Sequence, residues 1–465
     1  MKKTGKILTV AAVTLALTAG SAAGLYLYST QLVKVDGIPY RRGLQPLDLR
    51  EKAISVTHYE HLQKAFPQRK ILWKVPFQQR FYDSDVEKIT VTSLSQEDAE
   101  ILAYLPELKQ VDASNCFDYE GLQLLRQLKP ECQIDSFVAV DGQILPWNAE
   151  KLEFSQGQGN FEELMEKLAY LPKLQKVSLR EPRMTAKQLN ALREAYPKIE
   201  FFWTQRLFGK LLNSNQRILD ISGMKFKSIE EVENQTDYLP NLEKLIMCDS
   251  GLAYEDIADY RERSRDRFKV VFNVIIKNLD VRTDIVRFVP SELNVAPADH
   301  ETRYLKYCED LVYVDLSRCV VRNIDWAWGT PHLQYLIIKD SPLRDIQALR
   351  NLKELKLLEL SKLDLRDMRP LQDCEALEDL MITGVYPDIG VLGRMTWLKN
   401  LWVNGGRGEL QNMLPHTAVH AEYAGGWKDL PNYRYMQTIQ DPQIPKILLN
   451  PPKKPITPGF IIPKA

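Results

Sequence analysis

The sequence lacks the short motifs by which many enzymes and cofactor-binding proteins are recognised. It contains no Gly-x-Ser-x-Gly, no phosphate-binding P-loop, no dinucleotide-binding Gly-x-Gly-x-x-Gly and no His-Glu-x-x-His. It also has no Cys-x-x-Cys pair, which excludes a zinc ribbon on spacing. These absences predict a protein that is not an enzyme and that uses no cofactor and no metal ion.

Histidine is scarce, with six residues in 465. His58 and His61 would lie on one face of an expected helix, and His416 and His420 are also about one helical turn apart. Neither pair has a carboxylate and cysteine set near it in the sequence that would complete a metal-ligand shell. We therefore expect ordinary surface histidines.

No charge of one sign dominates, because 61 Lys and Arg balance 61 Asp and Glu. A nucleic-acid-binding protein needs a basic patch or stripe, so this balance gives no support for a nucleic-acid partner. With 45% apolar residues, the chain can bury a large core. Length alone predicts about three domains, unless the chain consists of repeats, which add length without adding separate cores.

The six cysteines are even in number, which outside the cytoplasm is typical of disulfides, but their positions indicate otherwise. Cys116 and Cys319 each stand three residues after the last apolar residue of an expected strand, where a thiol packs beneath a turn. Cys308 and Cys374 are three repeats apart, about 14 Å, whereas a disulfide needs Cα atoms within about 7 Å. We expect buried free thiols at Cys116, Cys132, Cys248, Cys308, Cys319 and Cys374.

The chain begins with a candidate membrane segment, residues 1–28. Three lysines precede residues 7–28, which carry no charge and would form a helix of about 33 Å, against roughly 30 Å of hydrocarbon. One interpretation is an uncleaved anchor, which gives a single-pass cell-membrane protein with an extracytoplasmic body. The alternative is a signal peptide cleaved near Ser21-Ala22-Ala23, which gives a secreted protein.

A fixed period runs through residues 311–403, where one six-residue block occurs five times. Each block reads Leu-x-x-[Leu/Val]-x-[Leu/Ile/Val], and successive blocks start 22, 22, 22 and 21 residues apart. Because side chains alternate between the two faces of a strand, each block predicts a short strand with one buried face. One repeat cannot bury that face alone, so neighbouring repeats must stack. The blocks begin at Leu311, Leu333, Leu355, Leu377 and Leu398.

The same period already runs near Leu47, since Ile71 follows Leu49 by 22 residues. Residues 47–310 carry it with a longer modulation, in which Tyr-Leu-Pro recurs at steps of 66 and 68 residues. We predict super-repeats of three strands here. Together with the regular repeats they would give about seventeen strands, and a sheet on the order of 75 to 80 Å long.

Several segments depart from the repeat. Residues 29–46 are expected to be a linker, and residues 277–306 fit poorly and carry no strand prediction. Residues 404–429 are expected to cap the stack, with a last strand near 417–423. Residues 430–465 hold eight prolines and almost no apolar periodicity, so we expect a proline-rich tail that forms no packed core.

The repeat resembles that of bacterial extracellular leucine-rich-repeat proteins, the class that includes internalin-like surface proteins. The resemblance covers about residues 47–423 and is most specific in 311–403. It implies an α/β fold, a leucine-rich-repeat solenoid with a parallel β-sheet on its concave face, and a role in protein recognition or scaffolding without catalysis. The chain departs from internalins because it has no steady asparagine ladder and no Leu-Pro-x-Thr-Gly sorting motif.

The residues displayed between the leucines are the predicted binding surface. On the five regular strands they include aromatic and apolar side chains beside single charges, which is the composition of a protein-binding patch. The alternative is that Tyr and Ile fill space there as good strand formers. The candidate ligand-binding residues are Tyr313, Asp315, Tyr335, Ile337, Lys339, Glu359, Met381, Trp402 and Asn404.

We therefore expect a non-catalytic, extracytoplasmic module that binds a protein or peptide ligand on the concave sheet surface. The alternative is a structural or scaffolding component of the cell envelope, in which the stack spaces neighbouring molecules. An envelope enzyme is a third interpretation, which no residue pattern favours.

The register of the repeat makes a first prediction. Leu358 is assigned to the buried face, where an unpaired carboxylate is costly, so Leu358→Asp should unfold the stack. Circular dichroism measures the outcome. A variant with an unchanged spectrum would contradict the assigned register.

Overall fold

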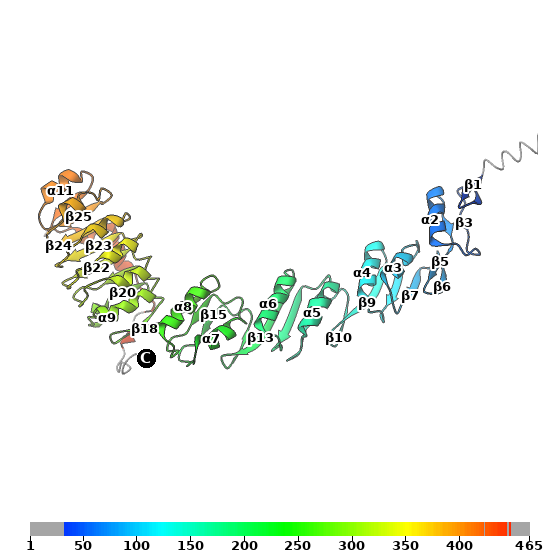
Figure 1. Cartoon of the computed structure of the whole chain (residues 1–465), viewed down its shortest axis with the longest axis horizontal. Coiled ribbons are helices and arrows are strands. Elements are labelled where there is room, and N and C mark those ends of the chain that lie inside the picture. The colour runs from blue at the N-terminus through cyan, green and yellow to red at the C-terminus, as the bar shows by residue number, and fades with distance from the viewer. Residues whose placement is uncertain (1–31, 423, 444–445, 448–465) are drawn as a thin grey trace, which may run out of the picture. The chain divides into compact units, whose positions relative to one another are not determined.

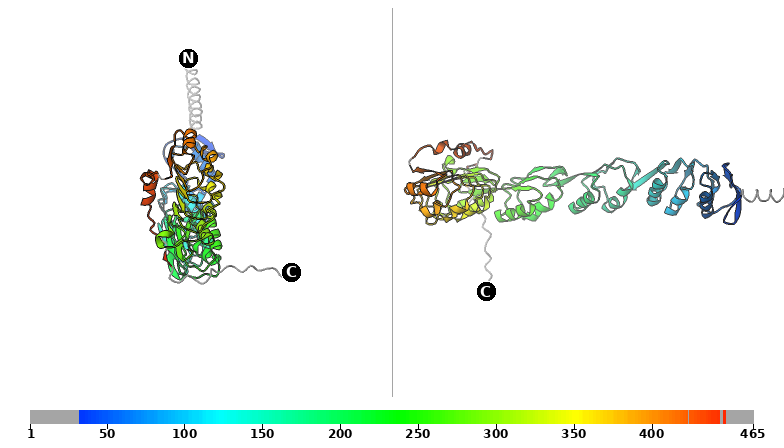
Figure 2. Two further views of the ribbon diagram at one scale, coloured as in Figure 1. Left: turned by 90° about the vertical axis from the view of Figure 1, so that its left-hand side faces the viewer. Right: turned by 90° about the horizontal axis from the view of Figure 1, so that it is seen from above.

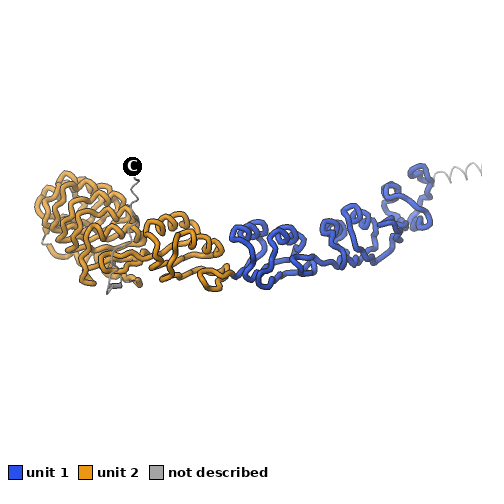
Figure 3. Tube along the Cα trace, turned by 60° about the horizontal axis from the view of Figure 1, so that its bottom comes forward, with its two compact units in different colours: residues 1–204 blue, residues 205–465 orange. Residues whose placement is uncertain are grey.

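The computed structural model describes residues 32–422, 424–443 and 446–447, and Figure 1 labels its elements. The chain divides into two compact units, residues 1–204 and 205–465 (Figure 3). No helix within the described ranges is long and apolar enough to cross a membrane. The predicted membrane segment, residues 7–28, lies outside those ranges.

Unit 1 begins with a hairpin of β1 (Leu32–Val35) and β2 (Ile38–Arg41). The prediction that residues 29–46 form a linker is therefore wrong for residues 32–41, and residues 29–31 lie outside the described ranges. The hairpin buries Val35 and Tyr40 in the same apolar cluster as Tyr59 and Leu62 of α2 (Val56–Ala65). These apolar side chains give the segment a partner to pack against, which a free linker would lack.

Parallel strands follow in small groups, separated by helices. The strands are β3 (Leu47–Asp48) and β4 (Ile71–Leu72); β7 (Lys88–Thr90), β8 (Gln110–Ala113) and β9 (Gln133–Val140); β11 (Lys151–Glu153), β12 (Lys176–Arg180) and β13 (Glu200–Leu207). The helices between them are α3 (Gln96–Leu102), α4 (Tyr119–Leu128), α5 (Phe161–Lys167), the 3-10 helix η1 (Leu168–Tyr170) and α6 (Ala186–Ala195). Leu47 pairs with Ile71, so the parallel strands do begin at Leu47, but the predicted 22-residue step from Leu49 to Ile71 is wrong because the paired residues are 24 apart.

Each of these groups is followed by an antiparallel hairpin. The long strand β9 shows how this happens, since Gln133–Ser136 pair with β8 and Phe137–Val140 turn to pair with β10 (Gln143–Pro146). The strand thus leaves the parallel ladder, and the sheet stops. A tight turn with positive φ at Asp141 and Gly142 closes the hairpin.

The hairpins overturn the prediction of one continuous sheet. The parallel strands β3 and β4, β7 to β9, β11 to β13 and β15 to β17 belong to four separate sheets, and β20 to β26 form another. The other hairpin strands are β5 (Lys74–Phe77), β6 (Arg80–Asp83), β14 (Lys210–Asn213), β18 (Asn273–Ile276) and β19 (Leu279–Arg282). Groups of three parallel strands occur in β7 to β9, β11 to β13 and β15 to β17, whereas the first group, β3 and β4, has two strands.

Unit 2 contains a three-stranded and a seven-stranded parallel sheet. The smaller sheet consists of β15 (Ile218–Asp220), β16 (Lys244–Ile246) and β17 (Lys269–Val271), with α7 (Ile229–Thr236) and α8 (Tyr254–Ser264) between them. The larger sheet consists of β20 (Arg287–Phe288), β21 (Tyr313–Asp315), β22 (Tyr335–Lys339), β23 (Leu357–Ser361), β24 (Asp379–Thr383), β25 (Asn400–Val403) and β26 (Ala418–Ala421).

Residues 277–306, for which no strand was predicted, do contain ordered elements. They complete the hairpin with β19, begin the seven-stranded sheet with β20, and continue into short helices. These helices are η2 (Pro290–Leu293), α9 (Asp299–Thr302) and the start of η3 (Arg303–Tyr307).

The seven-stranded sheet confirms the 22-residue register. Leu336 pairs with Val314 on one side and with Leu358 on the other, and Leu358 pairs in turn with Leu380. All four side chains are fully buried in the core of unit 2. Because so short a repeat leaves little chain for the return, the returns are mainly 3-10 turns and short helices: η4 (Asp325–Gly329), η5 (Gln347–Asn351), η6 (Arg369–Asp373), α10 (Ile389–Leu392) and α11 (Arg407–Met413).

The chain after β26 differs from the proline-rich tail that was predicted. Residues 427–438 form the 3-10 helix η7 (Trp427–Asp429) and α12 (Pro431–Thr438), and Met436 on α12 is fully buried. A further short strand, β27 (Lys446–Ile447), pairs with β19. The prediction that residues 430–465 form no packed core is thus wrong for 430–443, because this segment packs on a sheet rather than on itself.

The close stacking of returns makes a prediction at Gly329. A Cβ atom there would lie 2.1 Å from the Lys306 carbonyl oxygen of the neighbouring return, so Gly329→Ala should lower the free energy of unfolding by about 1 to 3 kcal/mol. Gly408→Ala is the matched control, since its Cβ meets nothing within 4 Å. Urea unfolding of both variants measures the difference. Equal stabilities would contradict the close approach.

Candidate functional site

The seven-stranded sheet has a second apolar face, opposite to its core. Alternate side chains of β21 to β25 point to this face, and residues 424–441 cross it. We call these residues the strap and the face beneath them the covered face. Figure 2 shows the strap, in red, along one side of the sheet. The covered face consists of Tyr313, Tyr335, Ile337, Leu357, Met381 and Trp402.

The structure places the nine predicted ligand-binding residues on or beside the covered face, but it contradicts their expected display to solvent. Tyr313, Tyr335, Ile337, Met381 and Trp402 are each at most 4% exposed, and Glu359 is also buried. Asp315 and Lys339 are half-buried, and Asn404 is exposed. The reason is that the strap occupies the surface on which a ligand was expected. Whether these residues bind another protein stays a prediction.

The strap holds the covered face mainly through apolar side chains. Met436 is buried in one cluster with the sheet residues, and Trp427, Leu430, Tyr433 and Ile439 pack against that cluster. Trp427 and Tyr433 meet edge to face, with ring centroids 4.7 Å apart. This arrangement removes large side chains from water on both partners, and a buried side chain of this size contributes about 1.5 to 3 kcal/mol.

Side-chain hydrogen bonds fix the position of the strap across the strands. The Trp402 Nε1–H group donates to the Ala424 carbonyl oxygen at 3.2 Å. The Asn432 side-chain amide donates to carboxylate oxygens of Glu378 and Asp379, at 2.9 Å each. Lys339 lies 5.1 Å from the centre of the Trp427 ring, within the range of a cation–π interaction.

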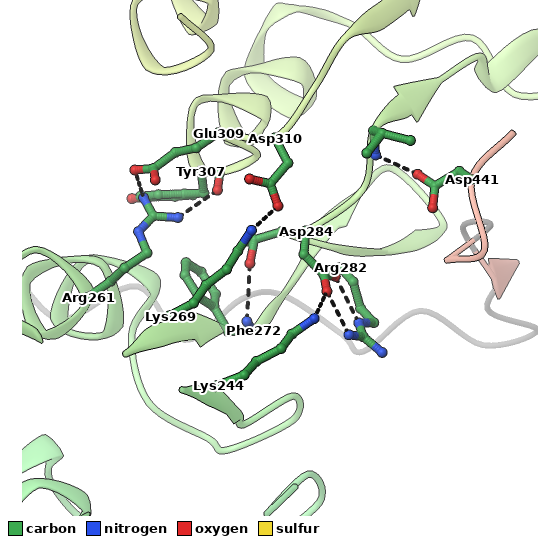
Figure 4. A network of polar contacts seen from close by, with 12 residues as sticks. Lys244, Arg261, Lys269, Phe272, Arg282, Asp284, Tyr307, Glu309, Asp310 and Asp441 are labelled. Atoms are coloured by element: carbon green, nitrogen blue, oxygen red, sulfur yellow. Dashed lines mark hydrogen bonds and ion pairs between the residues drawn. The ribbon is translucent and has the colours of Figure 1, made fainter. Parts of the chain in front are cut away.

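The strap ends at the first strand of the sheet. Asp441 is buried, and its Oδ2 atom accepts hydrogen bonds from the backbone N–H groups of Val286 at 2.6 Å and Arg287 at 3.2 Å. Figure 4 shows this carboxylate beside the start of the strand. Asp441 therefore satisfies backbone donors that the strand β20 would otherwise leave unpaired at the sheet edge.

Charged residues near Asp441 join the two sheets of unit 2, but they pair among themselves. Asp284 binds Lys244 at 2.7 Å and Arg282 at 2.8 Å, and these cations hold the pKa of Asp284 below its usual value despite burial. Two further pairs in Figure 4 are Arg261 with Glu309 and Lys269 with Asp310. Because every charge drawn there has a partner, this cluster holds the elements together and offers no charge to a ligand.

Sequence reasoning missed the strap itself and two sheet residues, Leu357 and Asp379. The signal available was the sequence from Trp427 to Met436, which concentrates Trp, Tyr and Met in a segment that otherwise reads as a proline-rich tail. Pro431 is one of the eight prolines on which the expected tail rested, but it occupies the first turn of α12, where proline is tolerated. An isolated short helix gives no periodic signal long enough to detect.

The histidine pair on α2 has the carboxylate partner that the sequence did not show. Asp36, from the turn between β1 and β2, lies 2.6 Å from Nδ1 of His58 and 2.8 Å from Nδ1 of His61. These hydrogen bonds lower the pKa of Asp36. The described residues contain no group of three or more His, Cys, Asp or Glu placed to hold a metal ion.

The cysteines are free in the structure, and five of the six are buried, with Cys248 half-buried. This confirms the prediction of free thiols. Burial raises the pKa of Cys248 to about 11 and that of Cys374 to about 12. Thiols with such pKa values stay protonated at neutral pH and are poor nucleophiles.

Comparison with known proteins gives limited structural similarity. No family model and no curated protein matches the chain. The solved structures that match include internalin C2 from Listeria monocytogenes, with 16% identity, 55% of this chain and 80% of that chain covered, and a TM-score of 0.21. The internalin InlF of the same species has 13% identity, coverages of 82% and 98%, and a TM-score of 0.22.

A Leptospira interrogans leucine-rich-repeat protein has 13% identity, coverages of 71% and 76%, and a TM-score of 0.23. At such TM-scores the whole chains do not superimpose, and nothing about function follows from them. The leucine-rich-repeat fold is instead established by the parallel strands of this chain and their 22-residue register.

The buried Glu359 predicts a dependence on pH. Its Oε1 atom lies 2.8 Å from Lys339 Nζ, while Oε2 accepts no hydrogen bond from the described residues, and burial raises its pKa. Asp315 and Tyr433 also face it. A carboxyl group with a raised folded-state pKa favours folding at acid pH, and this contribution is lost as the pH rises through that pKa.

We therefore expect Glu359→Gln to gain stability relative to the unchanged protein as the pH rises from about 4.3, the usual pKa of a glutamate, towards neutrality. Urea unfolding of both proteins between these pH values measures the difference in their free energies of unfolding. The other carboxylates are present in both proteins, so their effects cancel in that difference. A difference that is independent of pH would contradict a raised pKa.

Proposed function

We propose that this protein is a non-catalytic, extracytoplasmic protein-binding module, and that the covered face is its ligand-binding surface. One observation carries the proposal: the face already holds a segment of polypeptide, the strap, through buried apolar side chains and hydrogen bonds at both ends. A surface that binds one segment in this way has the chemistry to bind another of similar composition.

The composition of the face supports a peptide or protein ligand. Aromatic and large apolar side chains supply contact area, while Glu378 and Asp379 supply acceptors for a side-chain amide. The predicted residues Tyr313, Tyr335, Ile337, Met381 and Trp402 would be the apolar anchors. Asp315, Lys339, Glu359 and Asn404 would be the polar contacts around them.

The strap makes binding conditional. A ligand has to displace it, and a segment tethered to its own site has an effective concentration in the millimolar range when the linker is short and flexible. The ligand therefore needs either a higher affinity than the strap or a way to engage the strap first. In this proposal the strap occupies the binding surface as long as no ligand is bound.

The extracytoplasmic location rests on the sequence of residues 1–28, with three lysines before an uncharged apolar run. If the run is retained, the protein is anchored in the cell membrane; if it is cleaved, the protein is secreted. Both alternatives place the two units outside the cytoplasm.

A structural role in the envelope is the second candidate, and the open faces of the smaller sheets favour it. The clearest case is the sheet of β7 to β9, whose outward side chains are polar or charged, such as Lys88, Asp112 and Asp135, and none of these three is buried. Such faces need no cover, so these groups suit a spacer rather than an apolar binding site.

The proposed function is tested by loosening the strap in the full chain. Met436→Asp places a carboxylate in the apolar cluster, which costs several kcal/mol and should release the strap. A fluorescent synthetic peptide with the sequence of residues 424–443 should then bind to the variant and not to the unchanged protein. Fluorescence anisotropy measures binding, and limited proteolysis reports release of the strap.

Gln437→Asp is the matched control, because Gln437 is exposed on the same helix and its replacement should leave the strap docked. Folding of each variant is checked by circular dichroism. If the strap of Met436→Asp becomes sensitive to protease while the added peptide fails to bind, the covered face does not act as a binding surface for a separate chain.

A further inference from the structure

The three-strand groups that contain α4 and α8 repeat one set of contacts, so their residues can be matched. In each group the tyrosine that opens the helix, Tyr119 or Tyr254, accepts a hydrogen bond from a backbone N–H group of the following hairpin strand, at 3.0 or 3.1 Å. An arginine stands seven residues later, in the last turn of the helix. The two matched arginines are Arg126 on α4 and Arg261 on α8.

Arg261 shows what binds the guanidinium at this position. Its Nη2 atom lies 2.9 Å from Oε1 of Glu309, and its Nη1–H group donates to the Tyr307 carbonyl oxygen at 2.7 Å. Figure 4 shows both contacts beside the ring of Phe272, whose centre lies 5.7 Å from the guanidinium carbon. In this group a carboxylate from the next repeat therefore neutralises the arginine.

Arg126 stands in the same place without a carboxylate. Its Nη2–H group donates to the hydroxyl of Ser136, and its guanidinium carbon lies 4.3 Å from the centre of the Trp147 ring. With the residues that the structure describes it forms no ion pair, and its Nη1 atom has no hydrogen-bond acceptor among them. Burial alone lowers the pKa of Arg126 to about 10, so the group is still a cation at neutral pH. A buried charge is costly unless it is paired.

The residue that would supply a carboxylate to Arg126 is a proline. Pro172 corresponds to Glu309, because each stands two residues after a tyrosine and two residues before the first leucine of the next strand block. A proline side chain has no hydrogen-bond acceptor. Together with Arg126 and Ser136, Pro172 lines a cavity of about 50 Å³. One group thus pairs its arginine within the chain, and the other leaves a cavity beside it.

We propose that this cavity is a binding site for a carboxylate on a short aliphatic stem, and that Arg126 pairs with it as Arg261 pairs with Glu309. Such a group is carried by the side chain of a glutamate or aspartate of another polypeptide, and also by small organic acids. The site lies in unit 1, apart from the covered face, and goes beyond the proposed function.

The walls of the cavity suit this ligand. A guanidinium presents its N–H donors in one plane, which matches the two oxygens of a carboxylate, and Ser136 can add a hydroxyl donor. Leu122 and Val138 supply apolar side chains for the stem. Because one water needs about 10 to 15 Å³, the cavity admits about four heavy atoms, which is a carboxylate with one methylene. A larger ligand would insert its carboxylate and leave the rest outside.

Fluorine NMR of the full chain labelled with 5-fluorotryptophan tests the site, because the Trp147 ring lies against the guanidinium. The Trp147→Phe variant identifies the resonance of this residue. Sodium propionate, which corresponds to the glutamate side chain, should shift the resonance and reach saturation in the millimolar range. Propionamide, its uncharged analogue, should cause no saturable shift. Sodium chloride keeps the ionic strength constant throughout.

A peptide separates the two sources of the carboxylate. If the ligand is an acidic side chain of a polypeptide, acetyl-Gly-Gly-Glu-Gly-Gly-amide should shift the Trp147 resonance, and the same peptide with glutamine in place of glutamate should not. A response to propionate without a response to the peptide assigns a small organic acid instead. Both results support a carboxylate site.

Substitutions in the cavity give the second measurement. Arg126→Gln removes the charge and should weaken propionate binding about tenfold or more, since the ion pair is lost. Arg193→Gln, the same change in the last turn of α6, is the matched control and should leave binding within about twofold. Pro172→Glu supplies the carboxylate that Glu309 provides in the other group, so it should also weaken binding about tenfold or more.

The proposal is overturned if propionate shifts the Trp147 resonance no more than propionamide does, or if Arg126→Gln binds propionate as tightly as the unchanged chain. Circular dichroism shows whether each variant has folded. Should Arg126→Gln not fold, Pro172→Glu decides, because undiminished binding to that variant also overturns the proposal. The substituted residues belong to unit 1 and the strap belongs to unit 2, so the failure of this site and the failure of the proposed function are distinguishable.

Discussion

The seven-stranded sheet of unit 2 has apolar residues on both faces, and keeping both from water is the constraint on which the rest of the unit depends. The returns of each repeat cover one face with the leucine core. No return can reach the other face, because successive returns lie on the same side of a parallel solenoid. A separate segment has to cover it, and the strap does so with Met436 and the aromatic residues around it.

The smaller sheets solve the same problem by composition. The sheet of β7 to β9 has polar outward residues such as Lys88 and Asp112, so it needs no cover, and it ends where β9 turns into a hairpin with β10. The chain therefore contains two kinds of repeat surface. One kind is polar and exposed to solvent, and the other is apolar and covered by the C-terminal strap.

The two surfaces suggest different roles. The covered face combines a core of aromatic residues with hydrogen bonds at its margins, as protein-binding surfaces do. The hairpins expose backbone edges instead, where recognition comes from N–H and C=O groups and one side chain.

The sequence by itself determined the repeat, its 22-residue register, the buried leucines and the free cysteines. The reason is that apolar residues with a fixed period are buried together when the repeats stack in register. It also identified Tyr335, Ile337, Met381 and Trp402 as apolar residues that alternate with the buried leucines on neighbouring strands. This column of residues was predicted to be displayed to solvent for a ligand, whereas the strap covers it. Its occupant was not predictable, since nothing periodic links the sheet to residues 424–441.

Only the tertiary structure decided the occupant, the breaks between sheets and the partner of the histidines. Asp441 meets Val286 across 155 residues, Asn432 meets Asp379 across 53, and Asp36 meets His61 across 25. Such contacts depend on where distant segments end in space, which local patterns do not encode. The hairpin breaks had a local signal in Asp36-Gly37 and Asp141-Gly142, but a turn redirects a strand only once its neighbours have folded.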